Sequence, residues 1–513
     1  MKKHFAIAAL ILGATQLFAD IQLPRIFSDN ILLQREKPVK IWGTADANAK
    51  IDVEFAGTKK SATADARGKW SLALSPLEAS TTPREMKFYE NGKLSKTVAN
   101  VLVGEVWILG GQSNMEMTYS WRKINPKPNG KIRYFKNPIA LAEKPADDTS
   151  PNSRWVAADK NNLHAFSMIG YGFAQYIAEK LDIPVGLVYT ARGGAKMETY
   201  IPFEAMDASQ YLKSRRENYA KSLDAWRNGG YQKAKKKYDD LMAAIAKAKA
   251  ENKTPPKHFS YQKVKPDPVA PDFPLSTPAV HFNGMVAPVA GYAARGVLWY
   301  QGESNSRDEN FAEQFAVLVN SWRNAWSDKS LVWIATEIAS FDAKDADWGK
   351  TRQRQRAASH ALPDSYIVSA IDTGEQKDIH PADKAAISER MALTALGAVY
   401  GDKSAVYKSP EFKSAKYSAG SAEVLFETFG GKLAGKGQPR GFELKIDGKW
   451  VPAKAVLSGA DRVKVSAEST AVPQGVRYAF KSWVKPEVWL PPFLFCRFAQ
   501  RNIPRYFAET TIE

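Results

Sequence analysis

Cysteine is almost absent from this sequence: Cys496 is the one example in 513 residues. A single cysteine excludes an intramolecular disulfide and a zinc site built from several cysteines, so thiol chemistry is not the general plan of this protein. Long apolar runs are missing too. The longest near the N-terminus, residues 5–12, falls short of the roughly 20 apolar residues that a membrane-spanning helix needs. The sequence also has no internal repeat and no low-complexity segment, and it predicts no membrane span.

The first 19 residues have the pattern of a secretory signal peptide. Lys2 and Lys3 precede the apolar run, and small residues follow it up to Ala19. A buried N-terminal helix is the alternative, but the apolar run begins directly after the basic cluster and stops before a polar segment. We therefore expect residues 1–19 to be removed and the chain to be exported, to a periplasm or to the medium.

The charge balance is strongly basic. Lysine plus arginine number 72 against 54 acidic residues, which gives a formal net charge of +18. Such a chain attracts anionic partners at low salt, although the sign alone does not say which anion. Nucleic acid is one candidate, but the leader peptide and the lack of a recognisable binding motif argue against it. A Lys/Ala-rich helical segment at residues 233–253 is best explained as a solvated helix face.

The pattern of apolar residues divides the chain into three parts. Residues 20–100 carry short β-type runs separated by turn residues, which indicates a small antiparallel sandwich. Residues 404–513 return to the same character and predict a second β region. The apolar end of that region, residues 488–498, is unusual for an exposed tail, so we expect it either to pack on the body or to be a truncated or frame-altered end.

Residues 101–403 alternate continuous apolar runs with helical patterns. Runs without alternation are buried on both faces, as in a parallel sheet covered by helices, so we predict a doubly wound α/β domain. A helical and proline-rich stretch at about 204–278 is expected to be a surface insertion. The predicted strands are residues 105–109, 185–189, 296–300, 331–335 and 366–370, and the predicted helices are 166–181, 309–326, 350–361 and 383–400.

Chemistry-bearing residues follow four of these strands. In an open parallel sheet, ligands bind beyond the carboxyl ends of the strands. Ser113 comes after the first strand, the pair Gly193-Gly194 after the second, Asn305 after the third, and His380 with Asp378 after the fifth. An acyl-transfer site needs the groups that these residues supply: a hydroxyl, backbone N–H groups without a side chain in the way, a carboxamide, and an imidazole with a carboxylate.

Each part has an expected role. Ser113 would be the nucleophile, His380 the base and Asp378 the acid that orients the imidazole. The N–H of Ser113, an N–H of Gly193-Gly194 and the amide of Asn305 would form the oxyanion hole. Ser113 could instead cap a helix and Asn305 could close a turn, but four such features at four strand ends are a rare coincidence.

Three histidines could serve as the base. His164, His281 and His380 remain once those in the leader, in a predicted helix and in the insertion are set aside. Only His380 follows a strand end with an acid beside it, so it is the predicted base.

Three strings in the chain resemble a known family. They are GGQSNMEM at 110–117, LWYQGESN at 298–305 and DIHPADK at 378–384, and the chain is similar there to the sialate O-acetylesterase family, a branch of the SGNH (GDSL-like) hydrolases. The similarity extends from about residue 21 to about residue 480. It implies a flavodoxin-like catalytic domain flanked by β-sandwich-type regions, a serine esterase mechanism without metal or cofactor, and removal of O-acetyl groups from sialic acids or other glycans.

Carried over residue by residue, the resemblance gives Ser113, His380, Asn305 and the glycine pair the roles stated above. We also expect Gln112, Arg192 and Glu303 to contact the substrate. Arg192 is a departure from the branch, which more often has an aromatic residue at that position. A basic side chain there could recognise a sugar carboxylate. The usual superfamily acid lies three residues before the histidine, a position that Lys377 occupies here, so Asp372, Glu375 or a backbone carbonyl compete with Asp378 for the role of acid.

The sequence thus predicts an exported serine esterase that deacetylates carbohydrate. O-acetylated sialic acid is the favoured substrate. Acetylated plant polysaccharide such as xylan is the main alternative, and a catalytically dead glycan-binding protein is the alternative from another class. The sequence indicates neither the sugar position nor the oligomeric state.

Overall fold

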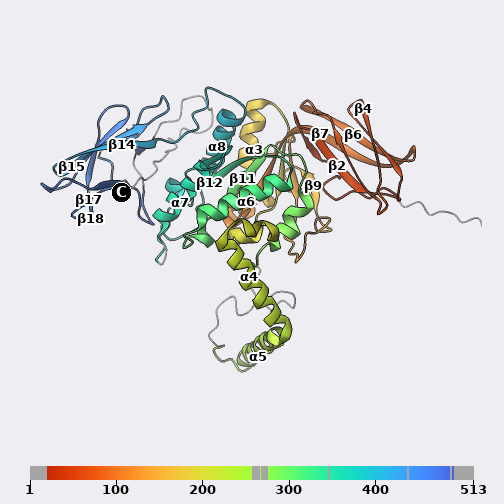
Figure 1. Ribbon diagram of the computed structural model, residues 1–513, viewed down its shortest axis with the longest axis horizontal. Helices are drawn as coiled ribbons and strands as arrows, with labels where there is room; N and C mark the ends of the chain where they lie inside the picture. The colour runs from red at the N-terminus through yellow and green to blue at the C-terminus, as the bar shows by residue number, and fades with distance from the viewer. Residues whose placement is uncertain are drawn as a thin grey trace, which may run out of the picture.

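The computed structural model describes residues 20–256, 266, 275–344, 347–435, 438–485 and 488–489. The predicted signal peptide and nearly all of the C-terminal tail, including Cys496, lie outside the described residues. The chain forms a mixed α/β fold with a large mixed sheet and further β regions at both ends (Figure 1).

The N-terminal strands form the β region at one end of the molecule. In that region β3 pairs antiparallel with β4 and β6, β2 pairs with β5, and β6 pairs with the long strand β7. Its strands are β1 (Leu32–Gln34), β2 (Val39–Thr44), β3 (Lys50–Phe55), β4 (Thr58–Thr63), β5 (Lys69–Leu74), β6 (Ser80–Glu90) and β7 (Lys93–Gly111).

Strand β7 joins this β region to the central sheet. Its first half is largely exposed and pairs with β6, whereas residues 101–111 are all buried. Residues 101–104 still pair with β6 and β1, and residues 105–111 pair with β10 and β11 of the central sheet. The boundary expected near residue 100 therefore falls inside one continuous strand. The strand that precedes the predicted nucleophile is therefore anchored in both the N-terminal β region and the central sheet.

The central sheet has the order β13-β12-β11-β7-β10-β8-β9, and all its pairs are parallel except β8 with β9. All five predicted strands are present, and β8 and β9 were not predicted. The bounds are β8 (Ile132–Lys136), β9 (Arg154–Ala157), β10 (Val185–Tyr189), β11 (Gly296–Tyr300), β12 (Val332–Thr336) and β13 (Ser365–Val368).

Helices cover both faces of this sheet. Along β11, Val297 and Trp299 join one apolar core with residues of α6, while Leu298 and Tyr300 join the other with residues of α3 and α8. Alternate side chains point to opposite faces of a strand, so each face is buried. The helices are α3 (Met168–Leu181), α6 (Phe311–Ala325), α7 (Trp348–His360) and α8 (Ala385–Thr394).

Short helical turns connect these elements. They are α1 (Ser113–Glu116), α2 (Tyr119–Arg122), η1 (Leu163–Ala165), η2 (Met197–Tyr200), η3 (Phe203–Ala208), η6 (Phe282–Val286), η7 (Ala287–Val289), η8 (Glu303–Asn305), η9 (Ile371–Thr373) and η10 (Ala395–Val399).

Two helices project from the body in the region of the predicted insertion. Helix α4 (Gln210–Ala225) leads away from the sheet, and α5 (Tyr231–Ala250) lies farthest out (Figure 1). Between them, η4 (Trp226–Gly230) contains a kink at Asn228 and Gly229. Nearly all residues of α5 are at least partly exposed, which agrees with a solvated lysine-rich surface.

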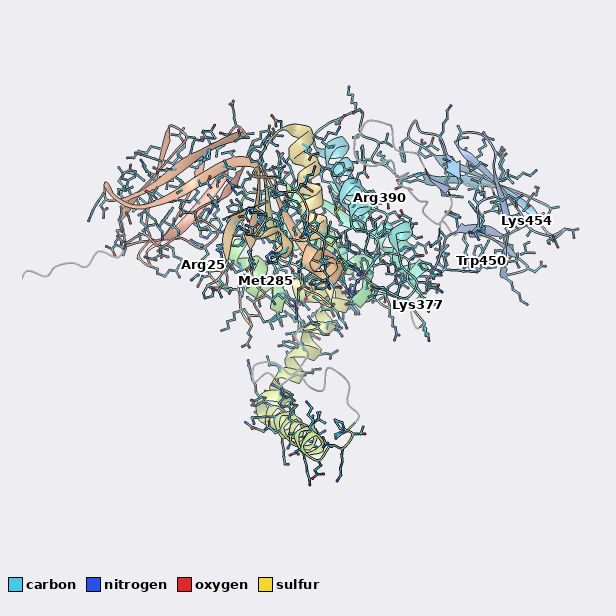
Figure 2. The ribbon with its side chains drawn as sticks, turned by 180° about the vertical axis from the view of Figure 1, so that it is seen from behind. Arg25, Met285, Lys377, Arg390, Trp450 and Lys454 are labelled. Atoms are coloured by element: carbon cyan, nitrogen blue, oxygen red, sulfur yellow. The ribbon has the colours of Figure 1, made fainter. Side chains whose placement is uncertain are left out.

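The C-terminal β region packs against α7. Arg352 of α7 donates hydrogen bonds to the carbonyl oxygens of Ala479 and Lys481. Trp450 and Lys454 mark this region in Figure 2, at the end away from the N-terminal strands. Its strands are β14 (Glu411–Ser418), β15 (Ser421–Glu427), β16 (Ala434–Gly435), β17 (Phe442–Ile446), β18 (Lys449–Pro452), β19 (Lys454–Leu457), β20 (Arg462–Ser466), β21 (Gly475–Tyr478) and β22 (Val488–Trp489).

Within the described ranges, no helix is both long enough and apolar enough to cross a bilayer.

Candidate active site

Ser113 and His380 meet at the carboxyl end of the central sheet. The Nε2 atom of His380 lies 2.8 Å from the Oγ atom of Ser113. Ser113 is the first residue of α1, directly beyond β7, and His380 lies in the loop between η9 and α8. A 2.8 Å contact is a good hydrogen bond, so the structure joins the two residues that a serine esterase requires.

The turn that presents Ser113 depends on a glycine. Gly111 has a φ of 119°, and a Cβ atom there would collide with the carbonyl oxygen of Tyr300 on the neighbouring strand β11. That same carbonyl accepts a hydrogen bond from the N–H of Gln112 at 2.9 Å. Glycine therefore lets β7 end tightly against β11 and turn into α1.

Asp378 is the carboxylate beside the imidazole. Its Oδ1 atom accepts the backbone N–H of His380 at 2.8 Å and lies 3.7 Å from the ring Nδ1 atom, too far for a hydrogen bond to the ring. Arg122 donates to the other oxygen of Asp378 and to the carbonyl of His380.

The two rival carboxylates are engaged elsewhere. Asp372 makes a two-pronged ion pair with Arg390 of α8, which is labelled in Figure 2, and Glu375 accepts the N–H of Ala382. Among these three acids, Asp378 is the one whose carboxylate lies beside the His380 ring.

The electrostatic surroundings favour a neutral imidazole and an ionised carboxylate. Burial lowers the pKa of His380, Asp378 opposes this, and the positive charges of Lys384 and Arg122 add to the lowering. Burial alone would raise the pKa of Asp378, but the hydrogen bond from the His380 N–H and the nearby Arg122 outweigh it and hold that pKa below its usual value. A neutral histidine beside a serine hydroxyl can accept its proton.

Gly193 lies against Ser113, as an oxyanion donor should. A Cβ atom on Gly193 would lie 3.4 Å from the Cβ atom of Ser113. The Gly193 N–H, however, already donates to the carboxylate of Glu116. Of the two glycines, Gly194 has the positive φ, 74°. Glu116 therefore covers one of the predicted donors.

Asn305 is 4% exposed and belongs to a buried network. Its Oδ1 atom accepts the N–H of Met197 at 3.0 Å, and its Nδ2 atom donates to Glu198 at 3.1 Å. Glu198 is paired in turn with Arg215 of α4 at 2.7 Å. The predicted oxyanion amide is thus rigidly fixed, with one of its two amide hydrogens used by Glu198.

The three expected substrate contacts differ in their surroundings. Gln112 is buried and accepts the N–H of Ser304, and an oxygen of Glu303 accepts from the Asn114 amide at 2.6 Å. Arg192 is 37% exposed and lies 3.8 Å from Glu116. Arg192 therefore has the best access to a bound sugar, and Gln112 and Glu303 have structural partners.

Four further residues surround the pair and were not singled out from the sequence. Asn114 and Lys384 lie within the motif strings, so their position in those strings was a usable signal. Trp121 and Arg122 belong to α2 and carried no motif signal. Trp121 is 52% exposed and its ring is edge-on to the ring of His380, with the centroids 6.3 Å apart.

The other candidate histidines have no comparable partner among the residues that the structure describes. His164 is exposed in η1, while His281 is buried and stacks on Tyr200 with ring centroids 5.2 Å apart. Burial, with the charge of Arg192, lowers the pKa of His281 to about 3. The part of the chain that the structure describes contains no group of three or more His, Cys, Asp or Glu side chains able to hold a metal ion.

Comparisons with known proteins agree with this site. Residues 281–396, which include Asn305 and His380, match the family model described as carbohydrate esterase, sialic acid-specific acetylesterase. Sialate O-acetylesterase of Rattus norvegicus is 24% identical over 507 residues, and the match covers 89% of each chain. The Homo sapiens enzyme is 22% identical over 504 residues, covering 89% of this chain and 87% of its own.

A solved structure is similar over nearly the whole chain. The crystal structure of a carbohydrate acetylesterase from Xanthomonas citri superimposes with a TM-score of 0.75 at 26% identity, covering 96% of this chain and 99% of that chain. Together with the site, these findings define the class of the protein: it is a carboxylic ester hydrolase of the carbohydrate esterase type. Within that class, the chain is similar over 89% of its length to sialate O-acetylesterases, and residues 281–396 match the family model of the sialic acid-specific acetylesterases.

Proposed function

We propose that the protein is an exported serine esterase that removes O-acetyl groups from carbohydrate and that its preferred substrate is O-acetylated sialic acid. The observation that carries the proposal is the 2.8 Å contact between Ser113 and His380 at the carboxyl end of the sheet. Export rests on the leader-like residues 1–19 of the sequence.

The proposed reaction has two halves. His380 Nε2 takes the proton of Ser113 Oγ as that oxygen bonds to the acetyl carbon. The tetrahedral intermediate then expels the sugar oxygen, which takes the proton from His380, and Ser113 is left acetylated. A water molecule, deprotonated by His380, attacks this ester, and acetate leaves as the proton returns to Ser113.

Three groups are proposed to stabilise the oxyanion. The N–H of Ser113 opens helix α1, where N–H groups have no partner within the helix. Because the Gly193 N–H donates to Glu116, we assign the oxyanion role in the glycine pair to the N–H of Gly194. The second amide hydrogen of Asn305 completes the set. Asp378 is proposed as the acid that orients His380.

An acidic sugar fits the charge around the site. Arg192 is exposed beside Gly193 and can pair with a substrate carboxylate, and the chain as a whole is basic. A neutral acetylated polysaccharide would use neither feature. We therefore favour sialic acid over xylan.

The experiment is a measurement of acetate release from O-acetylated sialic acids and from acetylated xylo-oligosaccharides. We expect kcat/KM to be higher for the sialates. The reverse ranking would assign the enzyme to plant polysaccharide, and binding of glycans without acetate release from any substrate would make it a glycan-binding protein.

A further inference from the structure

Three polar side chains, of which two are buried and one is half-buried, meet behind the Ser113–His380 pair. Asn114 follows the serine, Glu303 follows β11, and Lys384 precedes α8. The Nζ atom of Lys384 donates to Asn114 Oδ1 at 2.6 Å, and Asn114 Nδ2 donates to Glu303 Oε1 at 2.6 Å. Asn114 and Lys384 are each 1% exposed. Polar groups buried this deeply form a rigid unit only when they satisfy one another.

Asn114 also contacts the loop that carries the histidine. Its Nδ2 atom donates to the carbonyl oxygen of Ile379 at 3.2 Å. Asn114 is the neighbour of Ser113 in the chain, and Ile379 is the neighbour of His380. One carboxamide therefore joins the two segments that must bring Oγ and Nε2 together.

We propose that Asn114 and Lys384 are positioning residues of the esterase, which together fix the loop of His380 against the turn of Ser113. The inference rests on the proposed function, because it assigns a purpose to the distance between these two side chains. Lys384 orients the Asn114 amide through its oxygen, so the two donor hydrogens of that amide point to Glu303 and to Ile379. A misplacement of reacting groups by about 1 Å costs on the order of 10² in rate.

Lys384 also acts on the base through its charge. The ionisable groups that face Lys384 are Glu303, Arg122, Asp378 and Glu375, and those that face His380 are Asp378, Lys384 and Arg122. Burial lowers the pKa of Lys384 to about 7, so the side chain is charged at the lower pH at which His380 titrates. Its charge then contributes to lowering the pKa of His380.

Glu303 completes the cluster as an acceptor. Its second oxygen, Oε2, is buried and accepts no hydrogen bond from any residue that the structure describes. Burial raises the pKa of this carboxyl. A carboxyl with a raised pKa offsets the ammonium of Lys384 less completely than an ordinary carboxylate would.

The test compares four variants on an acetyl ester: Asn114→Ala, Lys384→Met, Lys384→Gln and Lys377→Met. Lys377 is exposed in the same loop and serves as the matched control for loss of a positive charge. We expect Asn114→Ala and Lys384→Met to lower kcat by about 10² with KM changed less than threefold. Lys384→Gln, which keeps a donor for Asn114, should lose less.

The pH profile separates positioning from general damage. Loss of the Lys384 charge should move the acid limb of kcat/KM to higher pH in both Lys384 variants, and Lys377→Met should move it less. If Lys384→Met does not fold, the acid limb of Lys384→Gln and the kcat of Asn114→Ala test the proposal.

Normal kcat in Asn114→Ala, or an unmoved acid limb in a folded Lys384 variant, would overturn the inference. The proposed function would still stand if Ser113→Ala were inactive, and would fall separately if Ser113→Ala were active.

Discussion

Asp378 has an arrangement that differs from a simple triad, because its hydrogen bond goes to the backbone N–H of His380 and not to the ring. The ring Nδ1 atom lies 3.7 Å away, close enough for the charge to act. In this geometry Asp378 acts on the ring through its charge, which works to raise the pKa of His380.

We expect Asp378→Asn to lower kcat, by up to about 10⁴ if the carboxylate sets the tautomer of His380. The sign of the pH effect follows from charge. Asp378 raises the pKa of His380, so its loss lowers that pKa, and the acid limb of kcat/KM should move to lower pH. Asp372→Asn and Glu375→Gln are the controls, each checked by thermal unfolding. A normal kcat in Asp378→Asn would leave a Ser-His dyad.

At this scale the sequence identified residues that follow strands and missed residues that act through contacts. Ser113 and His380 were predicted because each follows a strand. The contact of Asn114 with Lys384 joins positions 270 residues apart, and the contact of Arg122 with the His380 carbonyl joins positions 258 apart. Contacts between residues so far apart in the chain leave no local pattern in the sequence, so they are seen only in the folded structure.

The end of β7 is the element on which the site depends. Gly111→Ala would combine backbone strain at a φ of 119° with a collision against Tyr300, and we expect it to lower the free energy of unfolding by roughly 2–5 kcal/mol and to reduce kcat. Gly229→Ala is a matched control, since Gly229 has a φ of 110° and open space around it. Equal losses of stability in the two variants, measured by denaturant unfolding, would show that the collision is unimportant.

Helix α2 presents an exposed aromatic ring to the mouth of the site. We expect Trp121 to contact the sugar ring, because apolar rings line most small-molecule sites. Trp121→Ala should raise KM for an O-acetylated sialic acid about tenfold, a change of ~1.4 kcal/mol, with little effect on p-nitrophenyl acetate, which lacks the sugar. Leu94→Ala removes an exposed apolar side chain in the N-terminal strands and should change neither. Equal effects on both substrates would mean that Trp121 holds the ring of His380 in place and does not bind the sugar.

The predicted elements were those with strong hydrophobic patterns. Five apolar runs predicted five strands of the central sheet. Strand β8 contains Arg133 and ends at Lys136, so its pattern did not stand out, although Arg133 is buried and donates to the Gly130 carbonyl. A strand that contains a charged residue is hard to predict from its hydrophobic pattern, because the partner that allows the charge to be buried is visible only in the folded chain.

For the whole molecule, the basic charge should act on substrate capture. If anionic sugars are attracted over a distance, KM for an O-acetylated sialic acid should rise as the ionic strength goes from about 0.01 M to about 0.15 M, where the Debye length falls from roughly 30 Å to roughly 8 Å. KM for a neutral acetylated xylo-oligosaccharide should change little. A parallel response of both substrates would show that the +18 charge plays no part in selection.

The division into a leader, two β regions and an α/β part came from changes in composition and pattern, and it remains a prediction. What the sequence could not show is that β7 runs through the expected boundary. Composition changes within β7 because one half lies on a partly exposed sheet and the other in a sheet covered on both faces, and the backbone continues unbroken.

The central claim is that Ser113 is the nucleophile of an acetylesterase, and the most direct test is the kcat of Ser113→Ala for acetate release. Loss of the nucleophile of such a site typically costs on the order of 10⁶ in kcat. We expect a loss of that order with an unchanged unfolding temperature. A kcat within about tenfold of the unmodified enzyme, a difference of only ~1.4 kcal/mol in activation free energy, would contradict the assignment.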